Sequence, residues 1–291
     1  LIAADKDNTV AGNDTIGISA TSLSGSTIIG GGGNDSIVFS AVDNSVKDLV
    51  QGGKGNDFIV LATSTLDFAG STIRGGQGND SISFAAADAA TKLFFTTGLI
   101  AAGAGDDTIN LAATIAGTTA GMNGVTVEGG AGADSLTLSG VNVAGSATFL
   151  YSSLSDSTSA SMDTITLAAS ASLGSAAAIG SAAVNFKLSE TVILANGSGN
   201  SSVSGVTAQS GLVVFSSVDE DLDARISKLD AAFTTTGTVA VFSTNGTDQY
   251  IFVQGGATDG VIRITDSALL SAGVDFGRSG TIHASGTTFG F

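Results

Sequence analysis

Cysteine, proline and tryptophan are absent from this 291-residue sequence, and His283 is its single histidine. The lack of cysteine excludes disulfide bonds, thiolate metal sites and cysteine nucleophiles. The serines lie in stretches rich in Ser, Ala and Thr, without a partnering base that would make one of them a nucleophile. We therefore expect no enzymatic activity, and we expect stability to come from packing or from bound metal.

Basic residues are scarce, with 10 Lys and Arg against 26 Asp and Glu, which gives a formal net charge of −16. Nucleic acids and anionic membrane surfaces bind to basic faces, so neither is an expected partner. No apolar run approaches the roughly 20 residues that span a bilayer, so no membrane span is expected. Asp far outnumbers Glu, and the shorter carboxylate suits tight turns and hard cations. A cation is therefore the expected partner.

Glycine, in contrast, is abundant, with 41 residues, and hydrophobic residues still make up 43% of the chain, so it should fold. A glycine-rich segment with the pattern GGxGxD recurs five times, and its Asp residues are 22 to 27 positions apart. Five copies in register form a strong repeat signal. The copies are Gly30 to Asp35, Gly52 to Asp57, Gly75 to Asp80, Ala102 to Asp107 and Gly129 to Asp134.

Apolar residues occupy the second and fourth positions after each of these Asp residues, and this alternation predicts a strand. A branched apolar residue seven positions before each Asp predicts a second strand. A helix is excluded because each Gly would cost it about 1 kcal/mol. Stacked coils of this kind predict an all-β fold, a right-handed parallel β-solenoid. Its expected inward residues are Ile28, Val50, Ile73, Ile100 and Val127 in one row and Ile37, Phe39, Ile59, Leu61, Ile82, Phe84, Ile109, Leu111, Leu136 and Leu138 in the other.

On these five motifs the sequence resembles the RTX family, the glycine-rich nonapeptide repeats of bacterial proteins exported by type I secretion. The resemblance implies that the GGxGxD turns bind Ca²⁺ between successive coils. The usual array has turns on both edges, whereas one turn per 22 to 27 residues predicts a single calcium row. The longer coils look most like RTX-type solenoids of surface-layer proteins. The implied site residues are Asp35, Asp57, Asp80, Asp107 and Asp134, with Gly31, Gly33, Gly53, Gly55, Gly76, Gly78, Gly103, Gly105, Gly130 and Gly132.

Three regions are predicted from the decay of the motif. Residues 1–140 form the calcium-binding coils, with Asp14 in a worn first copy. Residues 141–215 continue the solenoid with degenerate motifs, because Asp163 has no preceding glycine and the segment 197–201 has no carboxylate. Residues 216–291 form a C-terminal cap and type I secretion region.

One helix is expected in that cap, where apolar residues fall at helical spacing between Ser217 and Phe233 behind a capping-box pattern, Ser217 to Glu220. We expect it to cover the open end of the solenoid. The segments 245–252 and 286–291 resemble, in style, the secretion region of RTX proteins. That resemblance implies a native C-terminus and export without a signal peptide, for a chain that forms the C-terminal part of a longer polypeptide.

Three functional classes are compatible with these features. The leading one is a structural protein of the bacterial cell surface, a surface layer or similar coat, secreted and assembled from copies of itself. It could contact cell-surface polysaccharide through a part that precedes Leu1. The second class is an adhesin or binding module, and the third is the folding and secretion module of a larger secreted enzyme.

Overall fold

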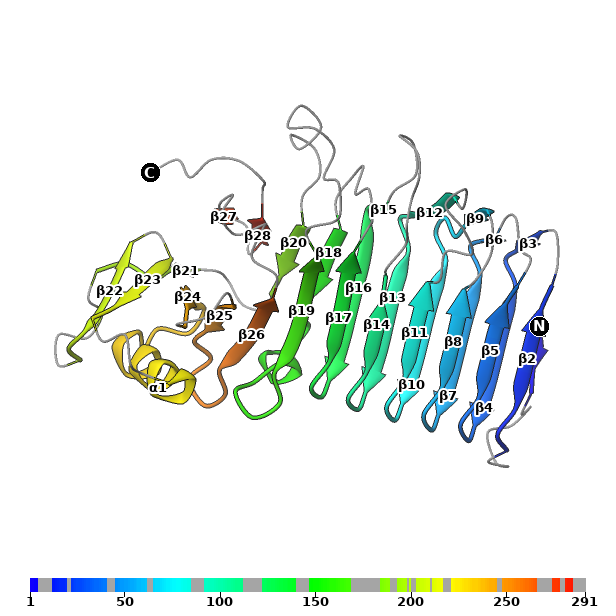
Figure 1. Ribbon diagram of the computed structural model, residues 1–291, viewed down its shortest axis with the longest axis horizontal. Helices are drawn as coiled ribbons and strands as arrows, with labels where there is room; N and C mark the ends of the chain where they lie inside the picture. The colour runs from blue at the N-terminus through cyan, green and yellow to red at the C-terminus, as the bar shows by residue number, and fades with distance from the viewer. Residues whose placement is uncertain are drawn as a thin grey trace.

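In the computed structural model, a regular stack of coils runs along the long axis of the molecule (Figure 1). The structure describes residues 1–4, 12–19, 22–40, 45–61, 65–84, 92–111, 122–139, 147–168, 184–188, 193–197, 199, 203–209, 211–216, 221–244, 248–265, 274–277 and 281–284.

Two long sheets form the faces of the stack. The first has 10 strands in the spatial order β1 (Ile2–Ala3), β4 (Thr27–Gly32), β7 (Leu49–Lys54), β10 (Thr72–Gln77), β13 (Leu99–Ala104), β16 (Val125–Ala131), β18 (Ala147–Leu150), β20 (Val184–Lys187), β28 (Thr281–Ala284) and β27 (Val274–Gly277). The second has 13 strands, namely β2 (Thr15–Ile18), β5 (Ser36–Phe39), β8 (Phe58–Leu61), β11 (Ser81–Phe84), β14 (Thr108–Asn110), β17 (Ser135–Ser139), β19 (Asp163–Ala168), β26 (Gly260–Thr265), β25 (Gln249–Val253), β24 (Thr238–Ser243), β23 (Leu212–Phe215) and β22 (Val206–Gln209), with β21 (Ile193–Leu194) paired to β24.

Neighbouring strands pair in parallel from β1 to β20 and from β2 to β26, which confirms the parallel β-solenoid. Short strands line a third edge in two further sheets: β3 (Leu23–Ser24) pairs with β6 (Ser45–Val46), and β9 (Thr65–Asp67), β12 (Lys92–Thr96) and β15 (Met122–Asn123) form a three-stranded sheet. No helix in the described part of the chain is long and apolar enough to cross a membrane.

The core contains the two predicted rows of apolar side chains. Ile28, Val50 and Ile73 face one another across successive coils, and all three are fully buried. The predicted residues of the second row are also buried, except that the side chain of Leu138 lies outside the described part. Phe68 and Phe95, which the repeat pattern does not predict, stack in the wider third edge. The solenoid core is therefore continuous from coil to coil, as the period-2 pattern predicts.

A second turn recurs at the edge opposite the glycine motif. A residue one or two positions before the first-sheet strand has a left-handed backbone in five successive coils, with φ values from 54° to 69°. In three coils this residue is Gly, but the other two carry Lys47 and Thr97. Because the side chains differ, the sequence gives no repeat signal for this turn. The left-handed region costs an ordinary L-residue roughly 1–2 kcal/mol, and a β-branched side chain is worse. The five positions are Gly25, Lys47, Gly70, Thr97 and Gly124.

Replacement of Thr97 by Gly is expected to stabilise the solenoid by about 1 kcal/mol, because the strained φ of 54° becomes unstrained. Equilibrium urea unfolding at fixed calcium measures the change. The reverse substitution in the preceding coil, Gly70→Thr, serves as the matched control and should destabilise by a similar amount. A Thr97→Gly variant less stable than the parent would contradict the strain argument.

The stack of coils ends earlier than residue 215. After β20 the chain leaves the solenoid for an antiparallel cap, in which β22 pairs with β23, β24 with β25 and β25 with β26. The chain then returns, and β26 pairs in parallel with β19, the last strand of the stack in the second sheet. The segment 193–215 therefore belongs to the cap rather than to the coils. The apolar ladder alone did not reveal this change, because cap strands also bury alternating residues.

The predicted helix is present as α1 (Leu222–Ala232), and Ile226 and Leu229 are buried. Its N-cap is Asp221, whose side chain accepts from the backbone N–H of Ala224 at 2.8 Å, and not the predicted capping box at 217–220, which lies outside the described residues. The helix packs in a second apolar core with Phe242 and Phe252. Val239 and Ile251, on the other face of the same strands, join the solenoid core. Cap strands thus close the core, and α1 covers those strands.

Candidate metal centre: a column of buried aspartates

The five motif aspartates stack in a single column inside the glycine turns. The Oδ1 atom of each accepts a hydrogen bond from the backbone N–H of the Asp one coil earlier. The donor–acceptor pairs are Asp14 and Asp35 at 2.9 Å, Asp35 and Asp57 at 2.8 Å, Asp57 and Asp80 at 2.7 Å, Asp80 and Asp107 at 2.6 Å, and Asp107 and Asp134 at 2.9 Å. The side chains of the five motif aspartates are only 1–2% exposed.

A second ladder runs beside this column in the opposite direction and is exposed to solvent. Here the side chain accepts from the backbone N–H one coil later, as from Asn56 to Asn34 at 2.8 Å and from Asn79 to Asn56 at 2.8 Å. Asp106 takes the acceptor role in the fourth motif copy, where Ala133 donates to it at 2.9 Å. The Asn that precedes the Asp in three motif copies is the sequence signal for this ladder.

The other carboxylate oxygen of the column has no such donor. The Oδ2 atoms of Asp57, Asp80, Asp107 and Asp134 are buried without a hydrogen-bond partner. Burial raises the pKa of Asp57 and Asp107 from the ordinary 3.8 to about 7, with further increases from neighbouring aspartates. Burial likewise raises the pKa of Asp80 and Asp134 to about 6. Such a column needs protons or cations to compensate its charge.

The donor chemistry of the column fits a hard cation. The buried atoms of the column that lack a hydrogen-bond partner are carboxylate oxygens, and Ca²⁺ takes 6–8 oxygen ligands from carboxylates, backbone carbonyls and water. Each coil contributes one carboxylate, so an ion between two coils would contact two of them. In keeping with this, the described residues contain no cluster of three or more His, Cys, Asp or Glu side chains suited to a metal. Backbone carbonyls and water would supply the remaining ligands.

The ten predicted glycines occupy two rows in these turns, all with φ between 108° and 141°. A Cβ at Gly53 would lie 2.0 Å from the carbonyl oxygen of Gly31, and a Cβ at Gly76 would lie 2.0 Å from that of Gly53. Both the backbone conformation and the close stacking of coils therefore require glycine here. The structure brings all fifteen predicted residues together, and their role as calcium ligands stays a prediction.

Gly76→Ala is expected to cost at least about 2 kcal/mol of folding stability, since it combines a positive φ with a backbone clash. Gly25→Ala is the matched control, because its φ of 64° is also positive whereas a Cβ there would have no other atom within 4 Å. The control lacks the clash and should therefore cost clearly less. Thermal unfolding with saturating calcium compares the two variants. Equal losses would show that the positive φ, rather than the close stacking of coils, sets the cost.

The column extends beyond the last glycine motif. Asp163 is 0% exposed, and its Oδ1 accepts from the backbone N–H of Asp134 at 2.9 Å. The glycine motif predicts that Asp163 lies in a degenerate coil outside the metal site, because no glycine precedes it. Its position is decided by the pairing of β17 with β19, in which Ser135 lies opposite Thr164.

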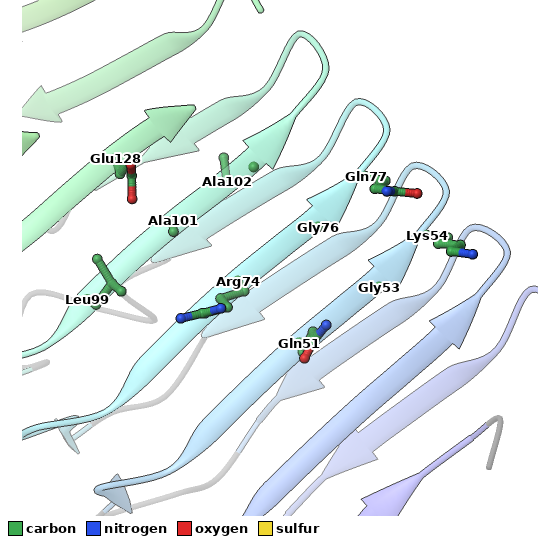
Figure 2. Close-up of a pocket in the computed structure, with 11 residues that line it drawn as sticks. Gln51, Gly53, Lys54, Arg74, Gly76, Gln77, Leu99, Ala101, Ala102 and Glu128 are labelled. Carbon is green, nitrogen blue, oxygen red and sulfur yellow. The ribbon is translucent and has the colours of Figure 1, made fainter. Parts of the chain in front are cut away.

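A shallow hollow lies on the outer face of the first sheet and reaches the glycine turns, because Gly53, Gly76 and Gly103 line it (Figure 2). Its volume is about 430 Å³, and glycines leave its floor without side chains. Arg74 and Lys54 contribute positive charge, whereas Glu128 contributes negative charge. The other lining residues are Gln51, Gly53, Gly76, Gln77, Leu99, Ala101, Ala102 and Gly103.

The fold and the column together define a parallel β-solenoid of cation-binding glycine turns. The family model of the RTX calcium-binding nonapeptide repeat (4 copies) matches residues 26–46, 43–61 and 70–86. No curated protein matches the chain. The chain thus carries RTX calcium-binding repeats, and Ca²⁺ is the ion that such repeats bind. The match covers the first three motif copies, and the structure continues the same hydrogen-bond column through two further copies.

Proposed function

We propose that this chain is a structural, calcium-dependent protein of the bacterial cell surface, a surface layer or similar coat, and that it has no enzymatic activity. The observation that carries the proposal is the column of buried carboxylates. The backbone of the preceding coil holds each carboxylate inside its own turn, so these acidic groups act in the stacking of coils rather than on a substrate.

Calcium would then control folding according to compartment. Extracellular calcium modules bind at about 0.1–1 mM, so the coils would be unloaded in the cytosol and loaded after export. RTX repeats are typical of secreted proteins, which supports this location. An unloaded chain is also the form that a secretion channel could pass, since uncompensated buried charges disfavour the stacked state.

Assembly would use the faces and ends of the solenoid. The parallel strands of the two long sheets give the stack regular faces along its length. Faces of this kind allow copies of one chain to pack against one another in a repeating array.

Electron microscopy of the purified protein, titrated with calcium, tests the proposal. We expect ordered assemblies above the calcium concentration that folds the coils, and fewer of them in the double variant Asp57→Asn/Asp80→Asn. His283→Gln is the control and should assemble like the parent. A monomer at every calcium and protein concentration would reject the coat and favour a secretion module or an adhesin.

The adhesin is the second candidate, and the hollow beside Arg74 favours it, because it is a concave surface with few side chains on its floor. Binding of surface polysaccharide by the calcium-loaded monomer, lost in Arg74→Ala, would support it. The coat proposal requires no such binding.

A further inference from the structure

The last turn of the aspartate column is built differently from the glycine turns. Between β18 and β19 the chain forms η1 (Leu154–Asp156), a 3₁₀ turn closed by reciprocal bonds with Ser153. Asp156 is 8% exposed, and its Oδ2 accepts from the Ser153 N–H at 2.7 Å and from the Ser152 hydroxyl at 3.2 Å. This turn therefore fixes a second carboxylate in addition to the Asp of the column.

Asp163 is held from both sides at the bottom of the same turn. Its backbone N–H donates to the Ser157 hydroxyl at 2.9 Å, and that hydroxyl donates to the carbonyl of Val261 in β26. Its Oδ1 accepts from the backbone N–H of Asp134, and its buried Oδ2 has no hydrogen bond of normal geometry. The contacts thus fix the side chain, and the Tyr151 hydroxyl is the one side-chain group that lowers the pKa of this carboxyl.

The hydroxyl of Tyr151 lies beside the carboxyl group of Asp163. Tyr151 is 5% exposed, and its hydroxyl makes no hydrogen bond of normal geometry. Burial, the charge of Asp163 and a side-chain hydrogen-bonding interaction with Asp163 raise the pKa of Tyr151 well above its usual range, in that order. Asp134 and Asp156 add negative potential at the same place.

We propose that this turn holds one further hard divalent cation, Ca²⁺, between Asp134 and Asp163, with the Tyr151 hydroxyl beside it. The Oδ2 atoms of the two aspartates would be its carboxylate ligands, and backbone carbonyls and water would complete the shell. The inference rests on the proposed calcium-dependent function. It extends the calcium row one coil beyond the boundary at residue 140 that the glycine motif predicts, through a turn without the motif.

Terbium luminescence tests this site directly, because Tb³⁺ replaces Ca²⁺ at oxygen sites and emits when a nearby Tyr is excited. The chain has only two Tyr and no Trp. Tyr250 is buried in the second core, stacked on Phe242 at 5.4 Å. We expect Tyr-sensitised emission in the parent and in Tyr250→Phe, and a loss of at least about ten-fold in both Tyr151→Phe and Asp163→Asn. Excess Ca²⁺ should quench the emission by displacement.

Two further measurements separate this inference from the proposed function. Calorimetric titration should count one ion fewer in Asp163→Asn than in the parent. Circular dichroism that is unaffected by calcium would defeat the proposed function as a whole. Calcium-dependent folding with emission that persists in Asp163→Asn, or with an unchanged ion count, would overturn only this inference. If Asp163→Asn does not fold, anomalous diffraction from parent crystals soaked in Tb³⁺ tests the site instead. The lack of a peak between Asp134 and Asp163 would overturn the inference. Tyr151 would then only donate a hydrogen bond to the carboxyl group of Asp163.

Discussion

Chelation of calcium at pH 8 is expected to unfold the stacked coils, and added calcium is expected to restore them. The buried Oδ2 atoms of Asp57, Asp80, Asp107 and Asp134 have no hydrogen-bond donor, so their charges oppose stacking when no cation is bound. Each ion present at ten times its dissociation constant adds about 1.4 kcal/mol of stability. Several such ions along the column would add about 4–7 kcal/mol, which is comparable to the marginal stability of a typical domain, about 5–15 kcal/mol. The β signal in circular dichroism, followed through a cycle of chelator and calcium, measures the effect.

The double variant Asp57→Asn/Asp80→Asn is the informative control for this prediction. Asn keeps an Oδ1 acceptor for the N–H donors at 2.8 Å and 2.7 Å, but it removes the charge. We expect a smaller difference in Tm between calcium and chelator, with a lower Tm in calcium and a smaller loss in chelator. An unchanged calcium response in this variant, or a parent whose β signal survives chelation, would show that the column is not a calcium site.

Acid is expected to substitute for calcium. In the calcium-free protein the pKa values of Asp57 and Asp107 are raised to about 7 and that of Asp163 to about 8, all from 3.8, chiefly by burial. Because folding raises these values, the folded chain binds more protons than the unfolded chain between pH 4 and pH 8. Stability in chelator should therefore be greatest near pH 4 and fall as the pH rises to about 8. At about 1.4 kcal/mol for each pKa unit, the three groups together would change the stability by on the order of 10 kcal/mol.

Urea unfolding in chelator across this pH range measures how the folding stability changes with pH. With saturating calcium the stability should instead rise with pH, because protons compete with the ion for the same carboxylates and calcium affinity falls with acid. Asp57→Asn/Asp80→Asn should flatten the slope in chelator, because two of the raised groups are gone. Stability in chelator that rises steadily from pH 4 to pH 8 would contradict the assignment of these buried carboxyl groups.

The repeat pattern predicted most of the solenoid because its causes are local. Alternation after Asp35 or Asp80 selects one face of a strand, and a glycine with φ above 100° must recur wherever two coils stack closely. The pattern failed at the turn that contains Lys47 and Thr97, because there the backbone conformation repeats while the residue type does not. It failed again at residues 193–215, whose strands bury alternating side chains in the second apolar core of the cap.

The sequence by itself determined the parallel stack, its period, its apolar rows and the set of aspartates and glycines that meet in the turns. These follow from repetition, since identical coils can satisfy their backbone groups only by stacking in register. Only the tertiary structure decided that the carboxylates lie inside the turns with one oxygen uncompensated, and that Asp163 joins them beside Tyr151 and Asp156. It also decided that β26 returns to cover β19. These features depend on contacts between segments up to about a hundred residues apart, such as Ser157 with Val261, and no local pattern encodes them.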